Sequence, residues 1–205
     1  MTNYTVKIKN NGSFKGDIAV YQRQPDLEKM GAMSLAWFTK GSNPNTEVEF
    51  GWGIDYSFVW SEVGKLKPGV IFKASQTVDA GLKVNNKVKL DKNDYGYLFE
   101  NLTTDPVHAG TLLIEESGLV PGGEASVGIG MSGFGTFVWQ AEPNVDLAIQ
   151  PKPEYWVTYG TYRQGEILDV QQMVNKSLKL DFPINKYNAV VTLNSDNTWG
   201  NIEYK

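Results

Sequence analysis

The chain contains no cysteine and only one histidine among its 205 residues. The absence of cysteine excludes disulfide bonds, thiolate catalysis and zinc sites built on cysteine. Basic residues are also few, with 19 lysines and arginines against 23 aspartates and glutamates, and the formal net charge is −4. A mildly acidic chain without a local basic run lacks the positive field that dominates nucleic-acid affinity. We therefore expect no nucleic-acid partner.

Long hydrophobic runs are absent as well. No window of the sequence approaches the roughly 18 consecutive apolar residues that suggest a membrane-spanning helix. The first residues, MTNYTVKIKNNGS, contain no apolar segment of the kind that a secretory signal peptide carries. We expect no transmembrane segment and a cytoplasmic location, with export independent of such a signal left open.

Aromatic residues are plentiful, at 12% of the chain, and they follow a period of two. The clearest case is FGWGIDYSFVW, residues 50–60, in which the large side chains occupy every even position: Phe50, Trp52, Ile54, Tyr56, Phe58 and Trp60. Successive side chains of a strand point to opposite faces of the sheet. The pattern predicts one half-buried strand with its aromatic face turned inward.

The same alternation recurs more weakly along the whole chain, with turn signals such as Asn11-Gly12 and Pro68-Gly69 between the runs. Short strands at a spacing of roughly 8–12 residues are typical of a sandwich or barrel. We expect an all-β fold, an antiparallel β-sandwich of roughly 10 to 13 strands that forms one domain over residues 1–205. Only residues 25–34 and 168–177 suggest short helices.

Several patterns that can carry chemistry have a simpler structural explanation. Gly128-Ile-Gly130-Met-Ser-Gly133 matches the dinucleotide-binding pattern, but a strand-like FGTFVWQ follows it where a helix is required. We interpret these glycines, with Gly135, as positions where the backbone bends or packs closely. His108 lies in the loop-like DPVHAG, and no G-x-S-x-G nucleophile motif accompanies it. We expect it to be an ordinary surface residue.

Carboxylates are also expected to be structural. Asp91 and Asp196 lie in Asn-rich and Gly-rich stretches that favour Asx turns over calcium loops. The pairs Glu47/Glu49 and Glu115-Glu116 are interpreted as solvated charge rather than as a glycosidase acid and base. The sequence thus predicts no catalytic residue, no metal ligand and no cofactor.

The aromatic residues of PEYWVTYGTYR cannot all belong to one core. Tyr155, Val157 and Tyr159 share one face of the expected strand, and Trp156 and Tyr162 lie on the other. Core or interface packing explains most of them. Exposed aromatic rings can also stack on sugars, so Trp156, Tyr162 and Trp199 are the candidate ligand-binding residues.

Long blocks of the chain resemble a known family. The blocks are residues 4–22, 35–76, 125–144, 153–170 and 193–199, the last reading LNSDNTW. Together they resemble the rhizosphere-induced protein family, the RhiA-like proteins of bacteria. The resemblance implies a soluble bacterial protein of a family linked to association with hosts or surfaces. It implies no enzymatic activity and no catalytic residues.

The leading hypothesis is a non-enzymatic β-sandwich protein that binds an unidentified ligand, with carbohydrate as the named candidate, or associates with itself as a homo-oligomer. Loops 40–46, 79–86, 103–110 and 118–124 are candidate binding loops, because sandwiches often present ligands at their ends. Three alternatives stay open: a structural protein that assembles into arrays or inclusions, a membrane-active toxin-like sandwich, and a hydrolase that uses His108.

Overall fold

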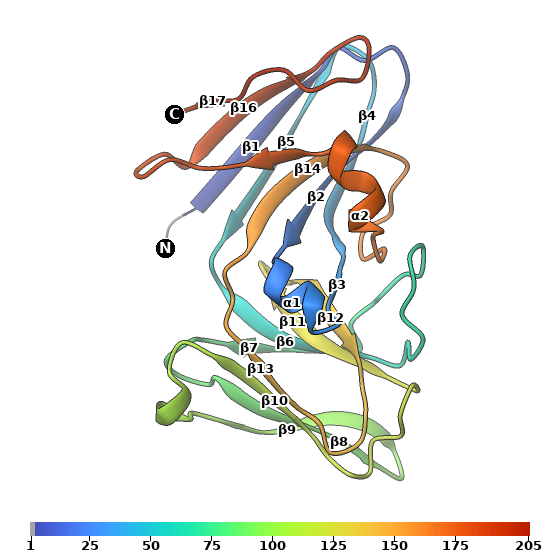
Figure 1. Ribbon diagram of the computed structural model, residues 1–205, viewed down its shortest axis with the longest axis vertical. Helices are drawn as coiled ribbons and strands as arrows, with labels where there is room; N and C mark the ends of the chain where they lie inside the picture. The colour runs from blue at the N-terminus through green and yellow to red at the C-terminus, as the bar shows by residue number, and fades with distance from the viewer. Residues whose placement is uncertain (1–2) are drawn as a thin grey trace.

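The computed structural model describes residues 3–205, which form four β-sheets and very little helix (Figure 1). Sheet I contains, in order, β17 (Glu203–Tyr204), β16 (Asn188–Leu193), β1 (Asn3–Asn10) and β5 (Thr46–Gly53). Sheet II contains β15 (Leu178–Leu180), β14 (Glu154–Gly160), β2 (Gly16–Arg23) and β4 (Ala36–Ser42). Sheet III contains β3 (Met33–Ser34), β12 (Phe134–Gln140), β11 (Ser126–Met131), β6 (Tyr56–Ser61) and β7 (Gln76–Ala80). Sheet IV contains β13 (Asp146–Ile149), β10 (Leu112–Glu116), β8 (Lys87–Asn93) and β9 (Gly96–Thr103).

The sheets pack in pairs, and each pair encloses its own hydrophobic core. Sheets I and II enclose one core, which includes Val6, Ile18, Phe50 and Val157. Sheets III and IV enclose the other, which includes Phe58, Leu90 and Ile114. Figure 1 shows the two sandwiches stacked along the long axis of the molecule. The expected all-β fold is confirmed, and none of the four sheets closes into a barrel.

Alternating burial explains most of the strands. In β1, Val6 and Ile8 are buried while Lys7 between them reaches solvent. Most neighbouring strands are antiparallel, as expected, but β1 pairs with β16 and β10 pairs with β8 in parallel. The seventeen strands within residues 3–205 exceed the expected number. Three of them contain only two or three residues, a length at which alternation gives no signal.

The prediction of one strand over residues 50–60 is wrong, because the chain changes sheets inside that segment. β5 ends at Gly53 in sheet I, and β6 begins at Tyr56 in sheet III. Ile54, expected inside, is 44% exposed. The Ser132 hydroxyl accepts a hydrogen bond from Gly53 N at 3.0 Å and lies 2.9 Å from Asp55 Oδ1. Contacts with Ser132, in a turn far along the chain, therefore stabilise the change of sheet between β5 and β6. The aromatic side chains expected on one face divide between the two cores, with Phe50 and Trp52 in one and Phe58 and Trp60 in the other.

A second connection, from β3 to β4, leads from the sandwich of sheets III and IV to that of sheets I and II. β3 pairs with β12 in sheet III, and β4, one residue later, pairs with β2 in sheet II. Leu35 between them forms a bridge to Ile167. At this junction the indole nitrogen of Trp37 donates a hydrogen bond to the carbonyl of Met131 at 2.8 Å, and Trp37 is fully buried. The junction thus ties β4 to the end of β11.

The helices are short, and all but η1, which falls in a segment expected as a loop, lie where the sequence suggests. α1 spans Pro25–Lys29 and begins with a proline, whose fixed φ suits a first helical turn. α2 (Val170–Met173) continues into the 3-10 helix η2 (Val174–Lys176), and η1 spans Pro106–His108. Within residues 3–205, no helix has both the length and the apolar character needed to cross a membrane.

Candidate functional site

The three aromatic residues singled out in the sequence do not form one site. Trp156 and Tyr162 lie on the outer face of sheet II, where they pack beside Tyr21 and Leu168 under α2. The ring of Trp156 stacks on Tyr21 with 6.4 Å between centroids, and the Arg23 guanidinium lies 5.6 Å from it. Trp199 instead packs at the rim of the core between sheets I and II. The predicted division of the β14 side chains between two faces is confirmed.

Trp199 lines a cavity of about 520 Å³, which we call the Trp199 pocket. Its lining residues come from the end of β14, from η2 and from the turn before Trp199, namely Tyr159, Gly160, Asn175, Lys176, Asn197, Thr198 and Trp199. None of the four candidate binding loops contributes to it. The pocket lies in the size range of small-molecule sites, roughly 300–1,000 Å³.

The turn before Trp199 is fixed by its own hydrogen bonds. Asp196 Oδ1 accepts from the backbone N–H of Thr198 at 3.0 Å and from its hydroxyl at 2.6 Å. These bonds hold the pKa of Asp196 below its usual value, so the carboxylate is ionised at neutral pH. Asn197 adopts a φ of 63°, a conformation that asparagine tolerates well. The expected Asx turn at Asp196 is confirmed.

Trp199 and Tyr159 are each held by a further contact. The indole N–H of Trp199 donates to the carbonyl of Lys176 at 3.0 Å. The Tyr159 hydroxyl donates to the carbonyl of Phe14 at 2.5 Å. The loop containing Phe14 is linked to the turn by a hydrogen bond from Ser13 Oγ to the Ser195 carbonyl at 3.1 Å. Figure 1 shows these two loops together at the top of the molecule. The two aromatic side chains are therefore oriented before any ligand arrives.

The chemistry of the lining suits a polar ligand with apolar faces. Two aromatic residues offer surfaces for C–H groups, and Asn175, Asn197 and Thr198 offer amide and hydroxyl groups that both donate and accept hydrogen bonds. No carboxylate belongs to the lining, whereas glycoside hydrolysis uses two. The arrangement is suited to binding such a ligand.

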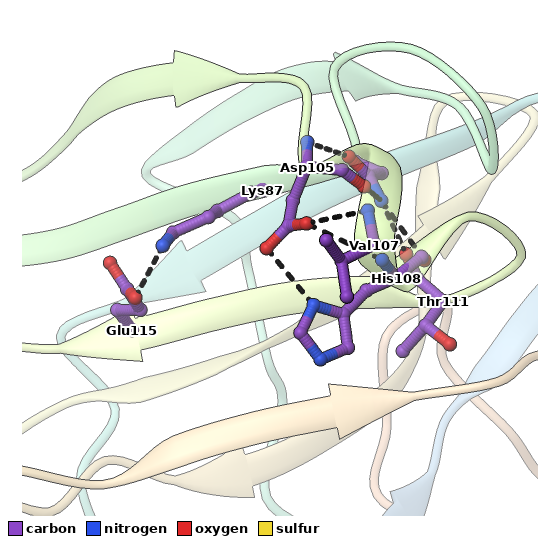
Figure 2. A network of polar contacts seen from close by, with 7 residues as sticks. Lys87, Asp105, Val107, His108, Thr111 and Glu115 are labelled. Atoms are coloured by element: carbon purple, nitrogen blue, oxygen red, sulfur yellow. Dashed lines mark hydrogen bonds and ion pairs between the residues drawn. The ribbon is translucent and has the colours of Figure 1, made fainter.

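His108 belongs to a different polar network, at the start of sheet IV (Figure 2). Its Nδ1 lies 2.9 Å from Asp105 Oδ2, and its side chain is 53% exposed. Contact with His108 lowers the pKa of Asp105 below its usual value. No hydroxyl of the described residues hydrogen-bonds to the imidazole ring, so the histidine has no nucleophile as a partner here. It stands as the surface residue that the sequence predicts.

Asn86 organises the loop around His108. It is fully buried, and its Nδ2 lies 3.1 Å from each of three backbone carbonyls, those of Asp105, His108 and Thr111. Its Oδ1 accepts from Asp105 N at 2.7 Å. Lys87 and Glu115 form an ion pair of 2.6 Å beside this loop (Figure 2). The side chains of Asn86, Asp105 and Lys87 each have a structural partner, which fixes the loop around His108.

The carboxylates behave as expected with one exception. Glu47 and Glu49 are exposed and lie beside Lys7 and Lys9 on sheet I. Glu116, expected in solvent, is only 3% exposed. The alternation Leu112, Ile114, Glu116 along β10 directs it into the sandwich, a signal already present in TLLIEES.

The burial of Glu116 changes its chemistry. Its Oε2 accepts from Glu142 N at 2.6 Å, while its Oε1 has no hydrogen-bond partner. Burial raises the pKa of this carboxyl to about 7, with smaller contributions from Glu142 and Asp146.

No metal centre accompanies these carboxylates. Across residues 3–205 no group of three or more histidines, aspartates or glutamates is placed to hold a metal ion. Near Asp91, Asn93 Oδ1 accepts from Tyr95 N at 2.8 Å, the Asx turn that the sequence predicts.

Some lining residues of the Trp199 pocket carry a sequence signal and others do not. Asn197 and Thr198 directly precede Trp199 and could have been included with it. Tyr159 was assigned to the inward face of its strand, which is correct, but its position at the strand end leaves it at the pocket. Asn175 and Lys176 lie in the segment 168–177 that the sequence predicts as a short helix, but the sequence does not predict that this segment ends at the pocket.

Comparisons with known proteins agree with the resemblance noted in the sequence. The profile of the family described as RhiA matches residues 1–203. The chain is 36% identical over 201 residues to Protein RhiA of Rhizobium leguminosarum bv. viciae, which covers 97% of this chain and 85% of that protein. No solved structure matches.

Proposed function

This chain belongs to the RhiA family, and we propose that it acts by binding a carbohydrate in the Trp199 pocket rather than by catalysis. The observation that carries the proposal is the composition of that pocket, in which Trp199 and Tyr159 stand beside Asn175, Asn197 and Thr198. A sugar ring presents C–H groups on its faces and hydroxyls around its edge, which matches aromatic surfaces ringed by amides and a hydroxyl.

Preorganisation supports the same proposal. The indole and the phenol are each fixed by a hydrogen bond to a backbone carbonyl, and the turn is closed by Asp196. A binding site whose side chains are already ordered loses less conformational entropy when its ligand arrives. A surface or host glycan is the source that agrees with the association expected of the family. A cytoplasmic location and the absence of a nucleic-acid partner stay predictions.

A glycan array probed with the purified protein tests the proposal. We expect competable binding to one class of glycan, and loss of roughly tenfold or more in affinity on Trp199→Ala, because aromatic anchors dominate binding energy. Asn175→Ala should weaken binding less, by removing one hydrogen-bonding group. Tyr95→Ala is the matched control, since Tyr95 is fully exposed on the β8–β9 turn far from the pocket lining.

Two results would count against carbohydrate binding at this site. One is an array without competable signal, and the other is a glycan whose affinity is the same for wild type and Trp199→Ala. Circular dichroism of the folded variant separates loss of the ring from loss of the fold. Trp199→Phe, which keeps an aromatic ring but removes the bond to Lys176, serves if the alanine variant does not fold.

A further inference from the structure

A second cavity, of about 380 Å³, lies at the junction of the two sandwiches. We call it the waist pocket, after its place between sheets II and III. Its lining comes from four parts of the chain: the β3–β4 junction, the loop before β7, the β11–β12 turn and residues 164–165. It shares no residue with the Trp199 pocket, so whatever it binds is recognised separately.

Two glycines border the pocket. Gly133 has a φ of +82°, a backbone conformation that glycine adopts readily in the β11–β12 turn. At Gly135 a Cβ would lie 3.0 Å from Leu35 Cδ1 and 3.3 Å from Phe72 Cε1, so any side chain would enter the space between these two walls. Gly135 therefore keeps part of the cavity open, whereas Gly128 and Gly130 of the dinucleotide-like pattern lie within β11.

The walls of the waist pocket are apolar and rich in aromatic residues. Leu35, Ile71, Phe72 and Phe134 line it together with Trp37. Phe134 is 46% exposed although its ring packs edge-on against Phe38, with 5.7 Å between centroids. An exposed apolar side chain beside a concave apolar surface gains by burial against a ligand.

The polar groups of the pocket favour a negatively charged ligand. Lys73 is exposed in its lining and forms no ion pair with any described residue. No aspartate or glutamate lines the pocket. Gln164 is anchored, since its Nε2 donates to the Trp37 carbonyl at 3.1 Å. The pocket thus combines aromatic and aliphatic walls with one lysine that forms no ion pair.

From this combination we propose that the waist pocket is a second binding site, which takes a small flat aromatic carboxylate. The ring lies among Phe72, Phe134 and Leu35, and the carboxylate faces Lys73. The volume of about 380 Å³ accommodates a molecule of two fused rings.

The test is a calorimetric titration with 2-naphthoate, with the neutral 2-naphthamide as the matched ligand. We expect saturable binding of one 2-naphthoate per chain and roughly fivefold weaker binding of the amide, the upper range for an exposed ion pair. Lys73→Gln should weaken 2-naphthoate by a similar factor, and Lys65→Gln, an exposed lysine of the same loop, should not change it.

A variant that fills the cavity completes the test. Thr77 is an exposed residue of β7 that lines the pocket, and Thr77→Trp should reduce 2-naphthoate affinity tenfold or more. Trp199→Ala should bind 2-naphthoate as wild type does, so failure of the carbohydrate proposal and failure of this one are separate results. Absence of saturable binding, or equal affinity in wild type and Thr77→Trp, overturns the proposal. Equal affinity for the acid and the amide removes the role of Lys73.

Discussion

Glu116 is the residue whose environment departs most from what its chemistry prefers. The fold buries its carboxyl at the end of β10 and leaves Oε1 without a hydrogen-bond partner. Because burial penalises the charged form, the pKa rises from its ordinary value of 4.5 to about 7. The folded protein therefore binds a proton between these two pH values that the unfolded chain has released.

This proton linkage gives a pH-dependent stability with a definite sign. The contribution of the protonated Glu116 is complete below about pH 4.5 and is lost as the pH rises towards 7. At about 1.4 kcal/mol for each pKa unit, the loss is on the order of 3 kcal/mol in the free energy of unfolding.

Glu116→Gln, which mimics the protonated group, should remove this slope in urea denaturation between pH 5 and 7.5. The control is Glu115→Gln, on the opposite face of the same strand, which should keep the slope. A wild-type slope unchanged in Glu116→Gln would show that other groups cause it.

Glycines in strands also constrain which substitutions the fold tolerates. Gly128 and Gly51 differ sharply in the room that each leaves for a side chain. A Cβ at Gly128 would lie 2.0 Å from the Phe137 carbonyl oxygen of the neighbouring strand. A Cβ at Gly51 would meet nothing closer than 3.6 Å. The close packing that the sequence predicts at Gly128 is therefore a contact within sheet III.

Gly128→Ala should therefore destabilise the protein by on the order of 3 kcal/mol, the cost of forcing the backbone of a packed strand to move. Gly51→Ala should change the free energy of unfolding by no more than about 0.5 kcal/mol, as is usual for surface positions. Chemical denaturation of the two variants measures both. Equal effects would mean that the strands near Gly128 relax freely.

At the scale of elements, alternation predicts a strand and its faces but not the sheet to which it belongs. The pattern of β14 gave both of its faces correctly, with Tyr155 inward and Trp156 outward. The pattern of residues 50–60 was equally regular and still failed. The failure lies at Ile54 and Asp55, where the hydroxyl of Ser132, far along the chain, accepts from Gly53 N and donates to Asp55 and so holds the change of sheet.

The candidate site shows the same limit. Trp199 could be chosen from sequence, because an aromatic residue beside a polar turn is recognisable. Its companions Tyr159 and Asn175 could not be assigned to it, since they come from β14 and η2 and meet Trp199 only in the folded protein. Trp156 carries the same composition signal, but it packs in a cluster with residues of α2 and beside Arg23, away from the Trp199 pocket.

At the scale of the whole molecule, the chain crosses between the two sandwiches more than once, so neither core is built from a separate stretch of sequence. The strands of the lower sandwich are β3 and those within residues 56–149, and the other strands before and after that range form the upper one. The run from β3 to β4, with the bond from Trp37 to the Met131 carbonyl, contributes to both. This segment couples the cores, because unfolding it in one sandwich removes residues that are packed in the other.

We therefore expect residues 1–205 to unfold as the single domain that the sequence predicts. Scanning calorimetry should give one transition whose calorimetric and van't Hoff enthalpies agree, the criterion for two-state unfolding. Two resolved transitions would instead assign each sandwich its own stability and would contradict the coupling through β3 and β4.

The central claim, that a carbohydrate binds beside Trp199, is tested most directly by nuclear magnetic resonance of the six tryptophan indole N–H groups. The protein is titrated with the glycan that scores in the array, and Trp199→Phe assigns the Trp199 signal. We predict that saturation shifts the Trp199 indole signal and the Asn175 side-chain amide, while the Trp156 signal stays in place. A bound glycan that shifts Trp156 and leaves Trp199 unchanged would contradict the account.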